Sequence, residues 1–166
     1  MMPIFYGMVV GSIIVTVFWG RKFIKKYAEL DGNIYKYQLY FITACKWIHI
    51  NQQKCSIRHW FLKHNYKSVI IYGIGELGKL LIYELEKTDV NVVCGVDQND
   101  LKVSGIQIMK PDDSIPSADV IIVTPIFCYE RIKKMLQIKT NCRIVSVEQL
   151  FAETLFMGRE DDYDSK

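Results

Sequence analysis

A glycine-rich turn between a strand-like run and a helix-like run holds the residues of this chain whose types and spacing could do chemistry. In VIIYGIGELGKLL, residues 69–81, Gly73, Gly75 and Gly78 match the pattern G-x-G-x-x-G. The first glycine would permit a tight turn, the second would let a pyrophosphate approach the backbone, and the third would let the helix pack closely. The free N–H groups at the start of that helix favour an anion. The turn therefore predicts a phosphate-binding site.

The residues around the turn strengthen this prediction. A second apolar run, VNVVCGVD, ends in Asp97 about twenty residues beyond the glycines, where an acid could bind a ribose diol and disfavour a 2′-phosphate. Glu76 suits the helix dipole but would repel phosphate if it pointed inward, so we expect it to point outward. The alternative is a turn of the same shape that binds nothing. The predicted cofactor-binding residues are Gly73, Ile74, Gly75, Glu76, Leu77, Gly78, Asp97, Thr124 and Pro125.

Short β-branched runs separated by turn-forming residues must position this site. They predict strands at residues 67–72, 90–97, 106–109, 119–124 and 142–147 and a helix at 127–137. The connections at 98–105 and 110–118 are too short for full crossover helices, so we expect the neck helices to cover the exposed sheet face. The predicted fold class is α/β, a reduced Rossmann-like parallel sheet of about five strands preceded by a helical neck and one transmembrane helix.

The first twenty residues carry no charge, and the apolar stretch ends at Arg21. A helix over residues 3–20 would span about 27 Å, close to the roughly 30 Å of a bilayer core. Because the basic residues follow the apolar stretch, we expect an uncleaved single-pass anchor in a bacterial inner membrane, with the amino terminus outside and the globular domain cytoplasmic. The alternative is a buried helix.

A basic neck follows the apolar head. Residues 21–67 hold ten Lys or Arg against two acids, which favours contact with anionic lipid over nucleic acid, since no nucleic-acid motif is present. Apolar residues from Ile34 to Ile48 at steps of three and four predict a helix, and Ser56 can cap a short second one. The predicted domains are an anchor at 1–20, the neck at 21–65, a nucleotide-binding domain at 66–157 and a charged tail at 158–166.

Other reactive residues do not form a recognisable catalytic or metal-ligating set. The five cysteines and three histidines lack the spacing of a zinc site, so we predict no metal. Tyr129 with Lys133 and Tyr83 with Lys87 match a Tyr-x-x-x-Lys pattern, but both lie on predicted helices without a substrate domain to close over them. We therefore predict no catalytic residues.

The stretches VIIYGIGELGKLLIYELEKTDVNVVCGVDQN, ADVIIVTP and IVSVEQLF resemble the Rossmann-like nucleotide-binding domains of bacterial polysaccharide-biosynthesis proteins. These include the amino-terminal domains of nucleotide-sugar epimerase/dehydratases and sugar acetyltransferases, and stand-alone capsule-associated relatives. The resemblance covers residues 66–152 and implies nucleotide binding at the glycine turn and Asp97. It also implies partners among glycosyltransferases or polysaccharide-assembly proteins.

These observations lead to one expected function and two alternatives. We expect a membrane-anchored, non-catalytic module that binds NAD or a nucleotide sugar in surface-polysaccharide (capsule) biosynthesis. The first alternative is an NAD-dependent oxidoreductase or epimerase acting on nucleotide sugars. The second is a protein-interaction scaffold with a vacant crevice.

Overall fold

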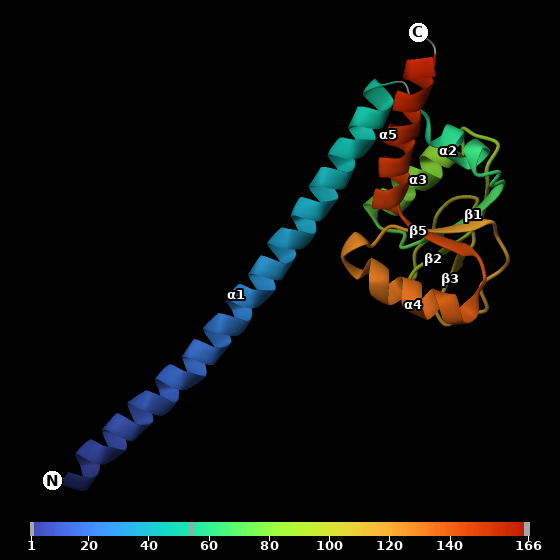
Figure 1. The fold of residues 1–166 in the computed structure, drawn as a ribbon. Coiled ribbons are helices and arrows are strands. Elements are labelled where there is room, and N and C mark those ends of the chain that lie inside the picture. Colours follow the sequence, from blue (N-terminus) through green and yellow to red (C-terminus); the bar gives the residue numbers. More distant parts are fainter. Residues whose placement is uncertain (1, 54, 165–166) are drawn as a thin grey trace. The chain divides into compact units, whose positions relative to one another are not determined.

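The computed structural model describes the backbone of residues 2–53 and 55–164, and the side chains of residues 16–53 and 55–158. The chain divides into two compact units, Met1–Leu39 and Tyr40–Lys166. Figure 1 shows the elements. The helices are α1 (Met2–Gln52), α2 (Ile57–Lys63), α3 (Glu76–Leu85), the short 3-10 helix η1 (Ile126–Cys128), α4 (Tyr129–Lys139) and α5 (Val147–Asp164). The strands are β1 (Ser68–Tyr72), β2 (Asn91–Val96), β3 (Ile108–Met109), β4 (Val120–Val123) and β5 (Arg143–Ser146).

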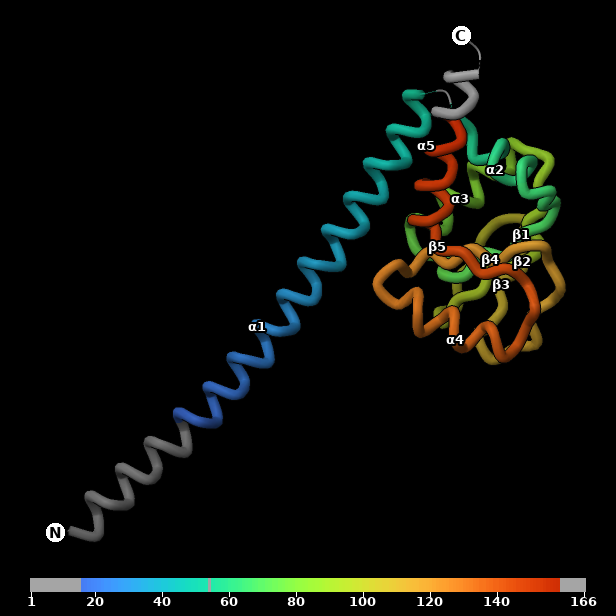
Figure 2. Tube along the Cα trace, viewed as in Figure 1, coloured from blue at the N-terminus to red at the C-terminus, as the bar shows by residue number. Residues whose placement is uncertain are grey.

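The predicted parallel sheet is confirmed. Its order is β3-β2-β1-β4-β5, and each neighbouring pair of strands is parallel. The connections on either side of β3 contain no helix, as their Gly, Pro and Asp content predicts, and the tube in Figure 2 follows them around the edge of the sheet. The runs at 69–71 and 120–123 are fully buried, which explains why they are apolar without alternation.

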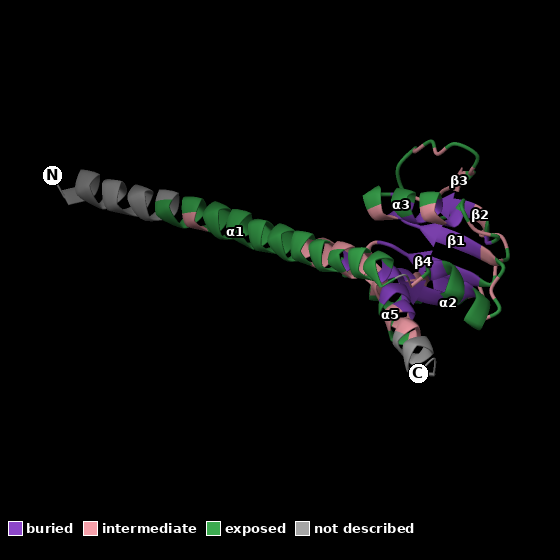
Figure 3. Ribbon diagram, turned by 90° about the horizontal axis from the view of Figure 1, so that it is seen from above, coloured by how far each residue is buried: buried purple, intermediate pink, exposed green. Residues whose placement is uncertain are grey.

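Each face of the sheet is covered by helices. Apolar residues of α2, α3, α5 and the end of α1 pack on one face, and α4 packs on the other. Figure 3 shows the strands of this unit as its most buried part. The prediction that the neck helps to cover the sheet is confirmed for α2, whose Trp60 and Phe61 are fully buried. Ser56 caps that helix by accepting a hydrogen bond from the Arg58 N–H at 3.1 Å.

The last turns of α1 lie against α5, more than a hundred residues later in the chain. The rings of Trp47 and Phe151 are 5.0 Å apart between centroids, and Lys46 Nζ donates to Glu148 Oε1 at 2.8 Å. Ile50 is fully enclosed in the same core. The compact unit therefore begins at Tyr40 and includes the end of the predicted neck.

An aspartate ties the amino ends of β1 and β4 together. Asp119 Oδ2 accepts hydrogen bonds at 2.8 Å from the backbone N–H groups of Lys67 and Ser68 and from the Ser68 hydroxyl. The Lys67 N–H, followed by the Ser68 donors, lowers the pKa of Asp119. This clamp fixes the register of the two central strands from the edge opposite to the glycine turn.

Helix α1 has 51 residues and continues from the predicted head into the predicted neck as far as Gln52, and α2 lies in the remainder of that neck. One prediction about the helices is corrected. Within the described part of the chain, no helix is long and apolar enough to cross a membrane, so the transmembrane anchor at 1–20 and the inner-membrane location are wrong. Most of that predicted anchor, residues 1–15, lies outside the described side chains. Helix α5 was not predicted, and it extends into the predicted charged tail as far as Asp164.

Candidate functional site

The order of the strands reverses between β1 and β4, which lie side by side at the centre of the sheet. In open parallel sheets, ligands bind outside the carboxyl ends of the strands at such a switch point. The predicted glycine turn leaves β1 at this point, and Thr124 and Pro125 leave β4 beside it. The structure therefore brings together the two segments that the sequence assigns to the site.

The first glycine of the turn is required by the fold. Gly73 has a φ of +90°, and a Cβ there would lie 2.5 Å from Pro125 Cδ and 2.8 Å from Thr124 Oγ1. The buried Thr124 hydroxyl donates to the Gly73 carbonyl oxygen at 2.6 Å, so β4 holds the turn in place. No residue other than glycine fits this position without strain.

The third glycine is also required by the fold. Gly78 lies in the first turn of α3, and a Cβ there would overlap the carbonyl oxygen of Gly73. Its absence allows the helix to approach the end of β1 closely, which is the packing that the pattern predicts.

The second glycine has no such structural cause. A Cβ on Gly75 would meet nothing within 4 Å, and the φ of −72° is accessible to any residue. Gly75 is the exposed N-cap of α3 and makes no side-chain cap hydrogen bond. Because the first N–H groups of a helix have no intrahelical partner, this end of α3 presents open backbone donors and the positive end of the helix dipole.

Asp97 lies directly against the glycine turn. Its Oδ2 accepts a hydrogen bond from the Ile74 N–H at 2.7 Å, and its Oδ1 accepts one from the Asn99 N–H at 2.8 Å. Each carboxylate oxygen can accept more than one hydrogen bond, so the half-buried carboxylate can still accept from a ribose hydroxyl. The sequence indicates only that Asp97 follows the second strand, whereas in the structure its carboxylate is hydrogen-bonded to the glycine turn itself.

The remaining predicted residues take different positions. Ile74 is fully buried beside Gly95, where a Cβ would lie 2.8 Å from Ile74 Cδ1, so the Ile74 side chain anchors the turn and faces no ligand. Leu77 packs against the core. Glu76 points outward, as expected, and pairs with Lys79 at 3.0 Å. The exposed or partly exposed members of the predicted set are Gly75, Glu76, Leu77, Asp97 and Pro125.

One residue near the site was missed by the sequence reasoning. Tyr72 ends β1 and is buried, and its pKa is raised by that burial and then by the charge of Asp97, against a lowering effect of Arg131. The sequence feature that could have identified Tyr72 is its position, as a polar aromatic residue directly before the first glycine.

The two Tyr-x-x-x-Lys pairs have structural roles. The Tyr129 hydroxyl donates to the Ile144 carbonyl oxygen at 3.1 Å, and Lys133 Nζ lies 5.4 Å from the centre of the Tyr129 ring. Lys87 Nζ lies 4.4 Å from the exposed Tyr83 ring on α3. Neither tyrosine is arranged as a proton donor at the switch point.

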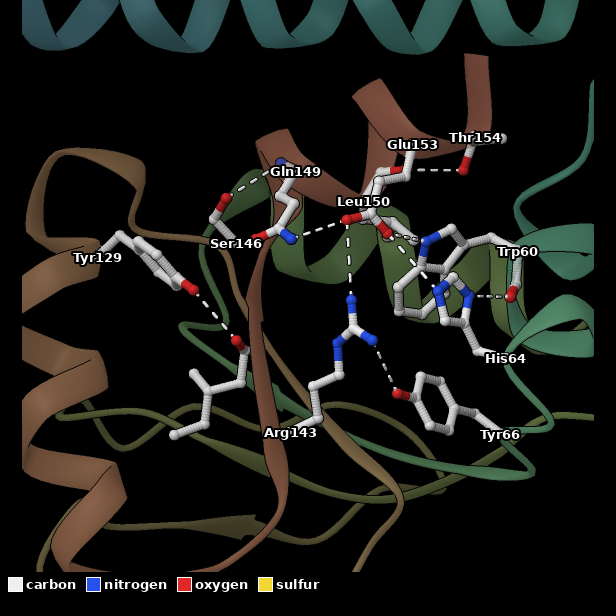
Figure 4. Close-up of polar contacts among 11 residues, drawn as sticks. Trp60, His64, Tyr66, Tyr129, Arg143, Ser146, Gln149, Leu150, Glu153 and Thr154 are labelled. Atoms are coloured by element: carbon white, nitrogen blue, oxygen red, sulfur yellow. Dashed lines mark hydrogen bonds and ion pairs between the residues drawn. The ribbon is translucent and has the colours of Figure 1, made fainter. Parts of the chain in front are cut away.

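A polar cluster at the opposite edge of the sheet joins α2 to α5 (Figure 4). The Glu153 carboxylate accepts hydrogen bonds at 2.7 Å from Trp60 Nε1 and from Gln149 Nε2, and Arg143 and His64 lie 3.8 Å away. Burial raises the pKa of Glu153, but these donors and charges outweigh burial and lower it. Because the described atoms of Glu153 are engaged with its own neighbours, we interpret the cluster as a structural clamp.

Open hollows lie away from the switch point. One hollow of about 660 Å³ is lined by residues 115–119 and 138–143. Another of about 220 Å³ is lined by residues between 85 and 92 and by residues 104–106. Both are at the amino ends of strands, whereas the glycine turn and the first turn of α3 are at the carboxyl ends. Among the described side chains, no group of three His, Cys, Asp or Glu could hold a metal ion.

Comparison with known proteins gives one match. Residues 65–145 match the family model described as C2185-like, N-terminal, which covers the sheet from before β1 into β5. No curated protein and no solved structure matches the chain. The description of this family names no capsule, NAD or glycosyltransfer function, so the resemblance to polysaccharide-biosynthesis proteins stays a prediction.

Proposed function

We propose that the switch point binds a nucleotide through its phosphates, and that the chain acts as a binding module without catalysis of its own. The observation that carries the proposal is Gly75, a glycine at an open position where the fold would accept any residue. Ser, Asp and Asn stabilise helix N-caps better than glycine does, so the fold alone gives no reason for glycine here. A phosphate that contacts the backbone does give one.

Different groups of the chain would bind different parts of the nucleotide. The N–H groups of the first turn of α3 would bind the phosphates, and Asp97 would accept from the ribose hydroxyls. The carboxylate would repel a 2′-phosphate, which favours NAD over NADP among dinucleotides. The sugar-nucleotide class rests on the sequence resemblance, so UDP and a UDP-sugar belong among the ligands to be tested.

The competing enzymatic function lacks an observation of its own. The Tyr129 hydroxyl, which belongs to one of the two Tyr-x-x-x-Lys pairs, already donates to the backbone carbonyl group of Ile144. A binding module does not require a tyrosine that is free to transfer a proton.

A matched pair of substitutions at Gly75 tests the proposal. Gly75→Asp adds a good N-cap and a negative charge, whereas Gly75→Asn adds an N-cap of the same size without charge. Thermal unfolding of the full chain is measured with NAD, NADP, UDP and UDP-glucose. A bound ligand at a hundred times its dissociation constant stabilises the fold by about 2.7 kcal/mol.

We expect one ligand class to raise the unfolding temperature of the native chain. Gly75→Asp should abolish this shift while unfolding as cooperatively as the native chain, and Gly75→Asn should bind better than Gly75→Asp. Unchanged affinity in Gly75→Asp, or no shift with any of the four ligands at millimolar concentration, would refute the proposal.

A further inference from the structure

The amino-terminal unit exposes a continuous apolar stripe on α1. Phe23, Tyr27, Leu30, Ile34 and Tyr37 follow one another at steps of four, three, four and three residues. Each of them is between 50% and 71% exposed. Residues 16–38 of α1 are almost all in the exposed class, and Figure 3 shows this exposed stretch of the helix in green. This alternating spacing is the seven-residue repeat of a two-stranded coiled coil.

The charged residues of α1 between residues 19 and 38 follow the same repeat. With Tyr27 and Ile34 at position a, and with Phe23, Leu30 and Tyr37 at position d, five charges occupy the outward positions b, c and f. These are Arg21, Lys22, Lys25, Glu29 and Lys36. Only Lys26, at g, and Asp31, at e of the next heptad, flank the stripe.

We propose that α1 pairs in parallel with α1 of a second copy of this chain, through residues 19–38. In a parallel pair, position g of one helix faces position e of the next heptad on the other, and these positions form interhelical salt bridges. Lys26 of each copy therefore faces Asp31 of the second copy, which gives two opposite-charge pairs by symmetry. An antiparallel pair would instead place g opposite g and e opposite e, and both arrangements join like charges.

The exposed area is sufficient for such an interface. A fully buried aromatic side chain removes about 150 to 250 Å² from water, so Phe23, Tyr27 and Tyr37, with Trp19 beside them, supply about 500 Å² at their observed exposure. Leu30 and Ile34 add to this, and the total approaches the roughly 800 Å² per partner of a standard interface. This inference is independent of nucleotide binding, which concerns the other unit.

Neighbouring residues provide matched variants for the test. Ile34→Glu places a charge at position a, and Tyr35→Glu places the same charge on the adjacent exposed outward position b. The mass of the full chain is measured by sedimentation over concentrations of about 1 to 100 μM. We expect a dimer whose dissociation constant rises at least a hundredfold in Ile34→Glu and little in Tyr35→Glu, because only the first change buries a charge.

Charge exchange tests the parallel register. Lys26→Glu and Asp31→Lys should each weaken the dimer about tenfold, because each creates two like-charge pairs. An equimolar mixture of the two variants should recover the native affinity, because every g–e pair is then of opposite charge.

Three results would overturn the proposal. They are a native chain that is monomeric at 100 μM, equal effects of Ile34→Glu and Tyr35→Glu, and a mixture of the charge variants that associates no better than either variant alone. Circular dichroism of each variant checks that the helix is retained.

Discussion

Alanine substitution should separate the glycines that the fold requires from the one that it does not. At Gly78, the added Cβ meets a backbone carbonyl group that cannot move aside, so the overpacking cost lies near the upper end of the range, about 3 kcal/mol. Alanine recovers about 1 kcal/mol of helix propensity. The net loss of unfolding free energy is therefore about 2 kcal/mol.

Gly73 should be less tolerant and Gly75 more tolerant. At Gly73 the left-handed backbone costs about 1 to 2 kcal/mol for alanine, and the contact with Pro125 adds up to about 3 kcal/mol, for a total near 4 kcal/mol. At Gly75 a poorer N-cap is offset by the lower entropy of the unfolded chain, so the change stays within about 0.5 kcal/mol. Gly95→Ala should fall between Gly75→Ala and Gly73→Ala, at about 1 kcal/mol, because its Cβ meets the side chains of Ile108 and Ile74 and no backbone atom among its nearest neighbours.

Urea unfolding followed by tryptophan fluorescence measures these differences, since Trp47 and Trp60 lie in the same unit as the glycine turn. The slope of free energy against urea should be unchanged among the variants, which shows that only native stability has changed. A domain of this size has about 5 to 15 kcal/mol of stability, so a loss of 4 kcal/mol is measurable. A loss above about 1.5 kcal/mol in Gly75→Ala, or a neutral Gly78→Ala, would refute the reasoning.

Two further predictions concern carboxylates at the amino edge of the sheet. The lowered pKa of Asp119 stabilises the fold above the unfolded pKa near 4, and this stability is lost as the pH falls through the folded pKa. Asp119→Asn should therefore flatten the loss of stability below about pH 4 in acid titrations of unfolding. An unchanged pH profile would contradict this. Glu153→Gln should cost about 1 to 2 kcal/mol in urea unfolding, because one amide oxygen cannot accept from both Trp60 and Gln149 in the same geometry; a neutral result would show that the clamp contributes nothing.

Local patterns predicted much of the domain because its elements are locally encoded. The β-branched runs at 69–71 and 120–123 need no distant contact to be recognised as buried strands, and Gly73 and Gly78 have the packing roles that their spacing indicates. The burial of Ile74 could not be predicted, since it depends on Gly95 in a neighbouring strand.

The errors came from features that depend on context. The hydrogen bond from the Ile74 N–H to Asp97 was not predicted, because it depends on the shape of the turn and not on the identity of its residues. The change from apolar to charged residues at Arg21 predicts a membrane boundary, but no helix in the described part of the chain is long and apolar enough to cross a membrane. Composition alone does not distinguish an anchor from an exposed helix.

The packing of the end of α1 on α5 has a consequence for the order of synthesis. Trp47 emerges from the ribosome about a hundred residues before Phe151, against whose ring it packs, and Ile50 belongs to the same core. At about 5 to 20 residues per second, these apolar side chains remain uncovered for several seconds or more while the sheet strands are made. This packing can form only after α5 has been made, so a chain that is interrupted before α5 leaves the apolar end of α1 open to other molecules.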